Sequence, residues 1–433
     1  MRVVILCMGS RGDVQPHIAL GEGLRRAGHK VRLATHPLFK EMVTAHGLEF
    51  APLNVDPQEM LLGTAGQTWV AAGRNPIRSM RRFLALTRPL IEQAISDSWK
   101  ASEGAEAVIF SMFTFPGYSI AEKLRIPCFA SGLQPFRRTR AFPAMSTRPP
   151  ALKCCNWMTH LMAEQIVWQP FRNIANQWRK ESLKLPPLSF TGPFPRLLRQ
   201  RLPHLYGYSQ SVMPKPFDWP DSVHVTGYWF MDRPAGWQPS ERLIDFLEAG
   251  PPPVYAGFGS MIDDDPAAKT DLVLEALALT GHRGVLATGW GGLGRRRLPD
   301  SVFQLDSVPH DWLFPRVVAA VHHGGAGTTA AALRAGVPSV TTPFLTTPFF
   351  CDQPFWGERL RKLGAGTRPV PIKRLTAESL AEAIHTASTD AGIRARAAAL
   401  GKRIGAEDGV ARAVEAFEHH LLHTDWERVW SIR

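Results

Sequence analysis

The stretch "AAVHHGGAGTTAAALRAGVPSV", residues 319–340, places two adjacent histidines at the start of a glycine-rich turn. The apolar residues before the turn have the composition of a buried strand, and those after it, up to Gly336 and Pro338, have that of a helix. Residues 322–329 are therefore predicted to form a strand-to-helix turn. Because the first N–H groups of a helix lack partners and carry the positive end of its dipole, the turn is a candidate anion site.

The residue types of the turn fit this chemistry. Glycine lets the backbone approach an anion, Thr328 and Thr329 can cap the helix or donate hydroxyl hydrogen bonds, and a histidine adds a donor that can be charged. A phosphate cradle is the favoured interpretation. The alternatives are core histidines satisfied by the backbone and a metal site, which is disfavoured because neighbouring side chains on a strand point to opposite faces.

Strands and helices alternate along the whole chain. The strands predicted in the first half are "RVVILC" (2–7), "KVRLAT" (30–35), "EAVIFSMF" (106–113) and "PCFASG" (127–132), and those in the second half are "PPVYAGFGSM" (252–261), "RGVLATGW" (283–290), "SVFQLDSV" (301–308) and "VVAAVHHGG" (317–325). This alternation is typical of α/β proteins with parallel, doubly wound sheets. A length of 433 residues favours two such Rossmann-like domains, which face each other across a ligand-binding cleft.

A Pro- and Trp-rich segment, residues 214–237, separates the two sets of elements. We expect an N-terminal domain at 1–215, a linker at 216–240 and a C-terminal domain at 241–405. The remaining residues, 406–433, are predicted to form a helix that packs back across the cleft.

Composition excludes several classes of protein. The five cysteines match no zinc-binding spacing and favour a reducing, cytoplasmic setting, and no apolar stretch is long enough to cross a membrane. The net charge is +12, and residues 137–201 hold twelve Lys or Arg against Glu164 and Glu181. Such a concentration favours contact with an anionic surface, whereas no nucleic-acid-binding signature accompanies it.

Five motifs occur in an order that resembles a known family: "GSRGDVQPHIALGEGLRRAGHKV" (9–31), "YAGFGSM" (255–261), "GWGG" (289–292), "VPHDWLFPRVVAAVHHGGAGTTAAALRAGVP" (308–338) and "DQPFWG" (352–357). The sequence resembles the sterol-type glycosyltransferases of the GT-B fold, a branch that includes glycopeptide-antibiotic glycosyltransferases. The resemblance runs from residue 1 to about residue 405. It implies an inverting, metal-independent transfer of a hexose, glucose from UDP-glucose, to a hydroxyl of a lipophilic sterol, terpenoid or polyketide. The nucleotide sugar is then a co-substrate, and no cofactor is expected.

The resemblance also implies which residues bind the donor. The diphosphate is assigned to His323, Gly325, Gly327, Thr328 and Ser260, with His322 leaning into the sheet or contacting the nucleotide. Asp352 and Gln353 correspond to the pair that binds the sugar hydroxyls, since a carboxylate accepts hydroxyl protons and an amide both donates and accepts. A capped turn is the alternative for this pair. The nucleoside is expected against Trp290, Val308 and Pro309.

By the same resemblance Asp13 is the base that takes the proton of the acceptor hydroxyl. The alternative for Asp13 is the N-cap of the helix that it directly precedes. The acidic run "IDDDPAAKTD", residues 262–271, invites comparison with an Asp-x-Asp metal site, but its position before a helix favours an acidic first turn. We therefore expect no metal.

Acceptor recognition is expected in segments 55–100 and 136–205, with Phe113, Trp157, Phe344 and Phe349 as candidate contacts. The second segment, which also holds Trp168 and Trp178, is either a helical pair with solvated Lys and Arg or a basic, aromatic collar that rests on anionic lipid. A tandem repeat, Thr341–Phe344 and Thr346–Phe349, precedes the Asp-Gln pair. Proline ends the strand by Pro343, so residues 345–349 are predicted to loop out at the cleft rim and leave Asp352 and Gln353 on the next helix.

Two other functions fit the same pattern. A nucleotide-sugar epimerase on this fold needs no acceptor, and a non-catalytic auxiliary protein binds a nucleotide sugar without turning it over. We expect a cytoplasmic monomer that can associate with anionic membranes.

Overall fold

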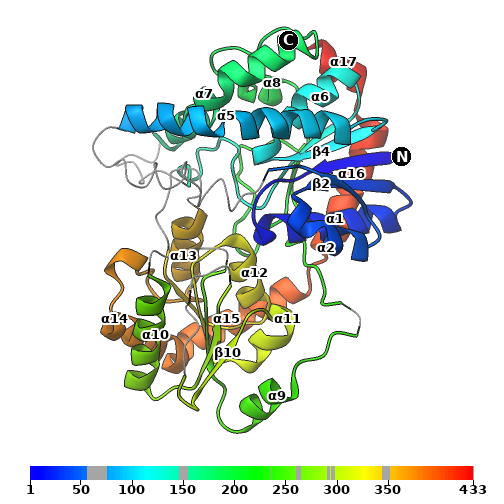
Figure 1. Cartoon of the computed structure of the whole chain (residues 1–433). Helices are drawn as coiled ribbons and strands as arrows, with labels where there is room; N and C mark the ends of the chain where they lie inside the picture. Colours follow the sequence, from blue (N-terminus) through cyan, green and yellow to red (C-terminus); the bar gives the residue numbers. More distant parts are fainter. Residues whose placement is uncertain are drawn as a thin grey trace. The chain divides into compact units, whose positions relative to one another are not determined.

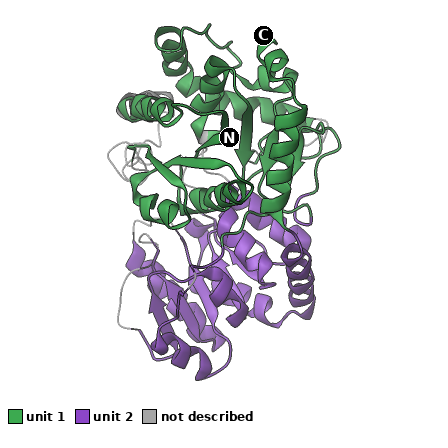
Figure 2. Cartoon of the chain, turned by 90° about the vertical axis from the view of Figure 1, so that its right-hand side faces the viewer, with its two compact units in different colours: residues 1–210, 214–231, 408–433 green, residues 211–213, 232–407 purple. Residues whose placement is uncertain are grey.

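The computed structural model describes residues 1–55, 76–145, 155–234, 236–259, 265–289, 293, 298–343 and 352–432, with only the backbone described for 76–86 and Phe113. The chain folds as parallel sheets flanked by helices (Figure 1). It divides into two compact units (Figure 2). Unit 1 contains residues 1–210, 214–231 and 408–433, and unit 2 contains residues 211–213 and 232–407.

Unit 1 is built on a sheet of seven parallel strands in the order β3-β2-β1-β4-β5-β6-β7. The strands are β1 (Arg2–Leu6), β2 (Lys30–Thr35), β3 (Glu49–Pro52), β4 (Ala107–Ser111), β5 (Cys128–Gly132), β6 (His204–Tyr206) and β7 (Val223–Val225). The helices are α1 (Arg11–Arg26), α2 (Lys40–Ala45), α5 (Pro76–Ala101), α6 (Pro116–Leu124), α7 (Asn156–Glu181), α8 (Phe194–Arg199), α16 (Gly409–His423) and α17 (Trp426–Ser431). Apolar residues fill β1, β4 and β5, as the continuous apolar runs predict for strands covered on both faces.

Unit 2 is built on five parallel strands in the order β10-β9-β8-β11-β12. The strands are β8 (Val254–Gly257), β9 (Gly284–Ala287), β10 (Val302–Leu305), β11 (Ala319–His322) and β12 (Ser339–Thr341). The helices are α9 (Glu241–Glu248), α10 (Pro266–Thr280), α11 (His310–Leu313), α12 (Ala326–Arg334), α13 (Asp352–Leu363), α14 (Ala377–Thr389) and α15 (Ala391–Gly405). The predicted α/β class with two parallel sheets is confirmed.

Two segments differ from the simple pattern that the sequence suggests. The stretch predicted as a linker contains β7, the edge strand of unit 1, and the chain passes from unit 1 to unit 2 after Met231. The C-terminal segment consists of two helices, since Thr424 is extended and Asp425 caps α17 by accepting from the N–H of Arg428. Both helices belong to unit 1.

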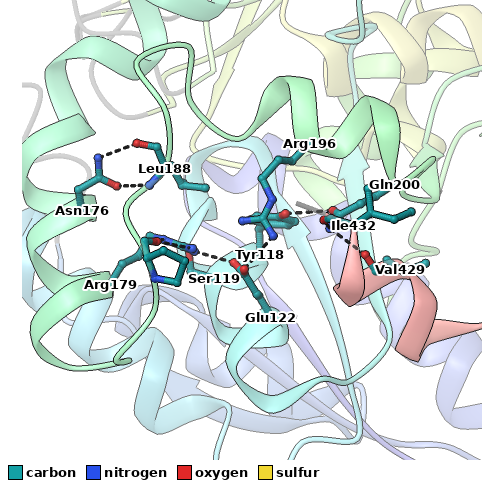
Figure 3. A network of polar contacts seen from close by, with 11 residues as sticks. Tyr118, Ser119, Glu122, Asn176, Arg179, Leu188, Arg196, Gln200, Val429 and Ile432 are labelled. Atoms are coloured by element: carbon teal, nitrogen blue, oxygen red, sulfur yellow. Dashed lines mark hydrogen bonds and ion pairs between the residues drawn. The ribbon is translucent and has the colours of Figure 1, made fainter.

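A buried amide fastens the last residues to unit 1 (Figure 3). The Nε2 of Gln200 donates to the carbonyls of Val429 and Ile432 at 3.0 and 3.1 Å, and its Oε1 accepts from the Tyr118 hydroxyl at 3.0 Å. The indole of Trp430 donates to the carbonyl of Ile126 at 3.1 Å. Val429 and Trp430 are therefore part of the core of unit 1.

Several of the Lys and Arg side chains in residues 137–201 lie inside unit 1. Arg179 has no exposed side-chain surface and donates to Glu122 and to the carbonyl of Pro186 (Figure 3). Arg196 pairs with the same Glu122 at 2.8 Å, and the largely buried Arg138 pairs with Glu164. The expectation that the Lys and Arg of this stretch are solvated or rest on lipid is wrong for these residues, because carboxylates inside unit 1 neutralise them.

Among the described helices, none has both the length and the apolar character needed to cross a membrane.

Candidate functional site

Each sheet reverses its strand order at one point. In unit 2 this point lies between β8 and β11, and in unit 1 it lies between β1 and β4. Ligands of open parallel sheets bind beyond the carboxyl ends of the strands at such a point. The two stretches singled out by the sequence, the turn after β11 and the turn after β1, both occupy this position.

His323 lies in the turn after β11 and is 9% exposed. A Cβ added to Gly259 would stand 2.8 Å from the ring, and one added to Gly325 would stand 2.3 Å from its Nε2, so both glycines are needed for the ring to fit. Burial lowers the pKa of His323 to about 4, and its Nδ1 is buried without a hydrogen-bond partner. The structure thus holds, at the start of α12, a neutral imidazole to which the described residues make no hydrogen bond.

The N-terminus of α12 has no side-chain cap. Its N-cap is Gly325, so the expectation that Thr328 or Thr329 caps this helix is wrong. Thr328 and Gly327 are partly exposed in the first turn, whereas Thr329 is buried with an unpartnered hydroxyl. The first N–H groups of the helix are left for an external acceptor, which suits an anion.

His322 lies in the interior of unit 2 with no exposed surface. Its Nδ1 accepts the N–H of Gly324 at 3.1 Å, and burial lowers its pKa to about 3. This arrangement corresponds to a histidine that leans into the sheet. The residues that the structure describes include no group of three or more His, Cys, Asp or Glu placed to hold a metal ion.

Asp352 and Gln353 begin helix α13, as predicted. Gly324 has φ +87°, and a Cβ there would stand 2.9 Å from the carbonyl oxygen of Gln353, so this helix start lies directly against the glycine turn. Gln353 is buried and Asp352 is partly exposed. The strand before them ends at Thr341, which confirms that it stops before Pro343. Residues 344–351, including Phe344 and Phe349, lie outside the described residues.

Other turns reach the same edge of the unit 2 sheet. Gly289 has φ +56°, and a Cβ there would stand 2.2 Å from the carbonyl oxygen of Gly259, so the ends of β9 and β8 touch. Ser260 and Trp290, which follow these glycines, lie outside the described residues. Val308 and Pro309 follow β10 and are partly buried, and Pro309 is the N-cap of α11. Of the acidic run, Asp265 caps α10 by accepting the N–H of Ala268 at 2.9 Å.

Asp13 lies in the first turn of α1. The N-cap of this helix is Ser10 and Asp13 is its third residue, so the alternative that Asp13 is the N-cap is wrong. The two residues form a capping box in which Oδ2 of Asp13 accepts from the N–H and the hydroxyl of Ser10 at 2.8 and 3.0 Å. No described residue donates to Oδ1 of Asp13. Desolvation by burial raises the pKa of this carboxyl, although the two bonds from Ser10 oppose the rise.

Two histidines for which the sequence predicted no role lie beside Asp13. His17 is one helical turn further along α1, and its Nδ1 is 2.7 Å from the carbonyl oxygen of Asp13. His36 follows β2, and its Nε2 accepts the N–H of Gly9 at 3.1 Å. The spacing of four residues between Asp13 and His17 was a signal in the sequence, since such residues face the same side of a helix.

The candidate acceptor residues are spread over unit 1. Phe113 lies in a short 3₁₀ turn, Met112–Thr114, directly after β4. Trp157 is 41% exposed near the start of α7, with the Arg138 guanidinium 5.5 Å from its ring centre. Trp168 is buried and Trp178 is partly buried, so these two residues do not form the predicted aromatic collar.

The fold and the turns together define a class of protein, the GT-B glycosyltransferases. The crystal structure of CalG4, the calicheamicin glycosyltransferase, matches with a TM-score of 0.70 over 98% of this chain and 99% of that chain at 19% identity. The glycosyltransferase SnogD from Streptomyces nogalater matches with a TM-score of 0.64 over 97% of this chain and 99% of its own at 21% identity. Residues 3–143 match the glycosyltransferase family 28 N-terminal domain, and residues 285–416 match the erythromycin biosynthesis protein CIII-like C-terminal domain.

Sequence relatives narrow the class to a family. The sterol 3-beta-glucosyltransferase UGT80B1 of Arabidopsis thaliana is 38% identical over 427 residues, which cover 97% of this chain and 68% of that protein. The sterol 3-beta-glucosyltransferase of Emericella nidulans is 38% identical over 97% of this chain, which spans 30% of that longer protein. The chain belongs to the glycosyltransferase family that contains these sterol 3-beta-glucosyltransferases.

Proposed function

We propose that the chain is an inverting, metal-independent glucosyltransferase that moves glucose from UDP-glucose to a hydroxyl of a lipophilic acceptor, with sterols as the first choice. The observation that carries this proposal is its 38% identity to sterol 3-beta-glucosyltransferase UGT80B1 over 97% of the chain. The turns of both units support it, since one suits a diphosphate and the other offers a carboxylate.

In the proposed reaction the start of α12 receives the donor diphosphate. Its unpaired N–H groups and the His323 ring face the charge that builds up on the leaving UDP, which stabilises the transition state. Asp352 and Gln353, next to the turn, accept and donate hydrogen bonds at the glucose hydroxyls. The remaining donor contacts are assigned to Gly325, Gly327, Thr328, Ser260, Trp290, Val308 and Pro309.

Asp13 acts as the general base. The acceptor oxygen attacks the anomeric carbon, the bond from that carbon to the diphosphate oxygen breaks, and UDP leaves with the electron pair. The acceptor proton passes to Asp13, through the oxygen Oδ1 that the capping box does not use. A raised carboxyl pKa favours this role, because a base works best when its pKa approaches the working pH.

Product analysis by mass spectrometry tests the function. UDP- and dTDP-sugars are incubated with sterols, triterpenoids and polyketide phenols, with and without EDTA. We expect glucosylated sterol from UDP-glucose, UDP release only when acceptor is present, and no effect of EDTA. Epimerised donor without acceptor would identify an epimerase, and donor binding without turnover would identify an auxiliary protein.

The Asp13→Asn variant tests the base. Asparagine keeps the size of the side chain but cannot take a proton, so turnover should fall at least about a hundredfold. UDP affinity, measured by calorimetry, should stay within about twofold because the donor residues lie in unit 2. Turnover within a few-fold of the wild type would mean that Asp13 serves the capping box alone.

We also propose that unit 1 rests on an anionic membrane through an apolar face, which consists of Phe190 in a loop and of Trp157, Met158, Met162 and Ile166 on α7. These side chains are 41–65% exposed, and the loop with Phe190 is tied to the helix because Gln169 donates to the Phe190 carbonyl at 2.9 Å. Arg172 stacks on the Phe190 ring at 4.9 Å, and Glu164, which is paired with Arg138, is the one acidic residue in 137–180. An apolar stripe bordered by the Arg172 guanidinium suits an anionic lipid surface.

Vesicle sedimentation tests this face. Met162→Gln combined with Phe190→Gln should abolish binding to phosphatidylserine-containing vesicles at low salt, while activity on a water-soluble acceptor remains. The matched control is Phe217→Gln, which changes a phenylalanine that is 82% exposed outside this face. Equal binding of the double variant and the control would refute the proposal. Arg137 and Arg138 are unsuitable targets because both are largely buried.

A further inference from the structure

Two buried histidine rings contact the main chain at the two ends of the turn from Gly9 to Asp13. His36 accepts the N–H of Gly9 at its Nε2 and donates from its Nδ1 to the carbonyl of Val55. His17 lies at the other end of the turn, with Nδ1 2.7 Å from the carbonyl oxygen of Asp13. Both histidines are 1% exposed. The turn that presents the carboxylate is thus fixed at both ends by rings from the interior of unit 1.

The surroundings of His17 fix its protonation. A carbonyl oxygen only accepts hydrogen bonds, so Nδ1 must carry the proton that bonds to Asp13. Nε2 is then an acceptor, and the hydroxyl of Ser131, 2.9 Å away, can donate to it in place of its bond to the Phe110 carbonyl at 3.2 Å. Burial lowers the pKa of His17 to about 4, which keeps the ring neutral at neutral pH. The edge of the ring also packs on Trp229, with ring centres 5.6 Å apart.

The first turn of α1 needs such external support. Pro16 lies inside the helix and has no N–H, so the carbonyl of Gly12 loses the partner that a helix normally supplies. A first turn that lacks one backbone hydrogen bond is held less firmly by its own main chain. The hydrogen bond from His17 acts one residue further on, at the carbonyl of Asp13 itself.

We propose that His17 is a positioning residue of the transfer reaction, which orients the Asp13 carboxylate by holding its main-chain carbonyl. This inference rests on the proposed function, in which Asp13 is the base. A geometry error of about 1 Å at a catalytic group is enough to cost up to about a hundredfold in rate, so a loosened turn should be visible in turnover.

Two amide substitutions test the two ring nitrogens of His17 separately. In His17→Asn the amide nitrogen reaches the position of Nδ1 and can still donate to the Asp13 carbonyl. In His17→Gln the amide reaches the position of Nε2, so the contact with Ser131 is kept and that with Asp13 is lost. We expect the Asn variant to keep turnover within about threefold and the Gln variant to lose about tenfold, the worth of one hydrogen bond. KM for the donor and the affinity for UDP should not change.

A double-mutant comparison decides whether His17 acts through Asp13. If it does, Asp13→Asn combined with His17→Gln is no slower than Asp13→Asn alone. Multiplication of the two losses would show an independent, structural role and overturn the proposal. The control is His204→Gln, which removes another Nδ1 bond to a carbonyl, that of Leu202 at 2.7 Å, and should lower stability without lowering turnover.

Failure of this inference is distinct from failure of the proposed function. A fully active Asp13→Asn variant removes the base assignment whatever His17 does. An inactive Asp13→Asn variant together with a His17→Gln variant of wild-type turnover leaves the base in place and removes the positioning role. Loss in the Asn variant equal to that in the Gln variant also overturns it, because the retained donor would then have no effect.

Discussion

Asp13 combines two tasks in one carboxylate. Oxygen Oδ2 accepts both bonds from Ser10 and so completes the start of α1, whereas Oδ1 has no donor among the described residues. The bonds from Ser10 favour the charged form and desolvation opposes it, and the net result is a raised pKa. The same serine that begins the helix therefore also sets the strength of the base.

Ser10→Ala tests this coupling. Loss of the hydroxyl donor removes one contribution that lowers the pKa of Asp13, so the acid limb of the kcat/KM profile should move to higher pH. The lost cap should also cost about 1 kcal/mol of stability. Ser240→Ala removes a comparable cap, that of α9, and controls for the stability loss alone. An unmoved acid limb would show that another group limits the reaction at low pH.

At the scale of elements, the turn between β11 and α12 depends on the absence of side chains. The His323 ring fills the space that a Cβ on Gly259 or Gly325 would take. Gly324 lies directly against the carbonyl of Gln353 at the start of α13. Glycine is needed at Gly324 also because its φ is +87°. These contacts bring the helix N-terminus, the imidazole and the Asp-Gln pair to one edge of the sheet.

Gly325→Ala is expected to displace the His323 ring, since the new Cβ would stand 2.3 Å from Nε2. UDP binding by calorimetry should weaken by about 1.5–3 kcal/mol, the magnitude of a hydrogen bond to a charged group. Gly405→Ala is the control, because a Cβ at that helical glycine meets nothing within 4 Å. Unchanged UDP affinity in Gly325→Ala would place the diphosphate away from this turn.

Local sequence patterns predicted most of the helices and strands. The features that they missed depend on backbone geometry or on contacts between residues far apart in the sequence. Continuous apolar runs identified β1, β4 and β11, and the Asp-Gln pair was correctly placed at the start of α13. Ser10 was missed as the cap because serine and aspartate are equally good caps, and only the backbone decides between them. The burial of Arg179 was missed because its partner Glu122 lies far away in sequence. Strand β7 has only three residues and lies inside a Pro- and Trp-rich segment. Three residues are too few to show the alternation of apolar and polar side chains that predicts a strand.

Across the whole molecule, burial keeps several imidazoles neutral. The histidines with a pKa lowered to about 3 or 4 include His17, His204, His322, His323 and His420. In each case desolvation is the largest cause, because the charged ring is taken out of water. An unfolded chain binds a proton at these sites near pH 6.5 and the folded chain does not, so acid favours unfolding.

The free energy of unfolding should therefore fall as the pH drops from about 6.5 to about 4. Two fully buried rings such as His17 and His322 alone give a slope of about 2–3 kcal/mol per pH unit near pH 5. Urea titrations at pH 7, 6 and 5 measure it. His17→Asn should lower the measured slope by about 1 kcal/mol per pH unit, the share of one ring. A stability that is flat over this range would contradict neutral burial.

Because residues 408–433 complete unit 1, the order of synthesis differs from the order of completion. All seven strands of its sheet are translated roughly 180 residues before α16 begins, a delay of about 10 to 40 s at ordinary elongation rates. Until then Phe129, later covered by Phe417 with ring centres 4.6 Å apart, has no cover from that helix. On the ribosome, unit 2 can finish folding first although it is encoded second, and the nascent N-terminal half carries open apolar surface that a chaperone can bind.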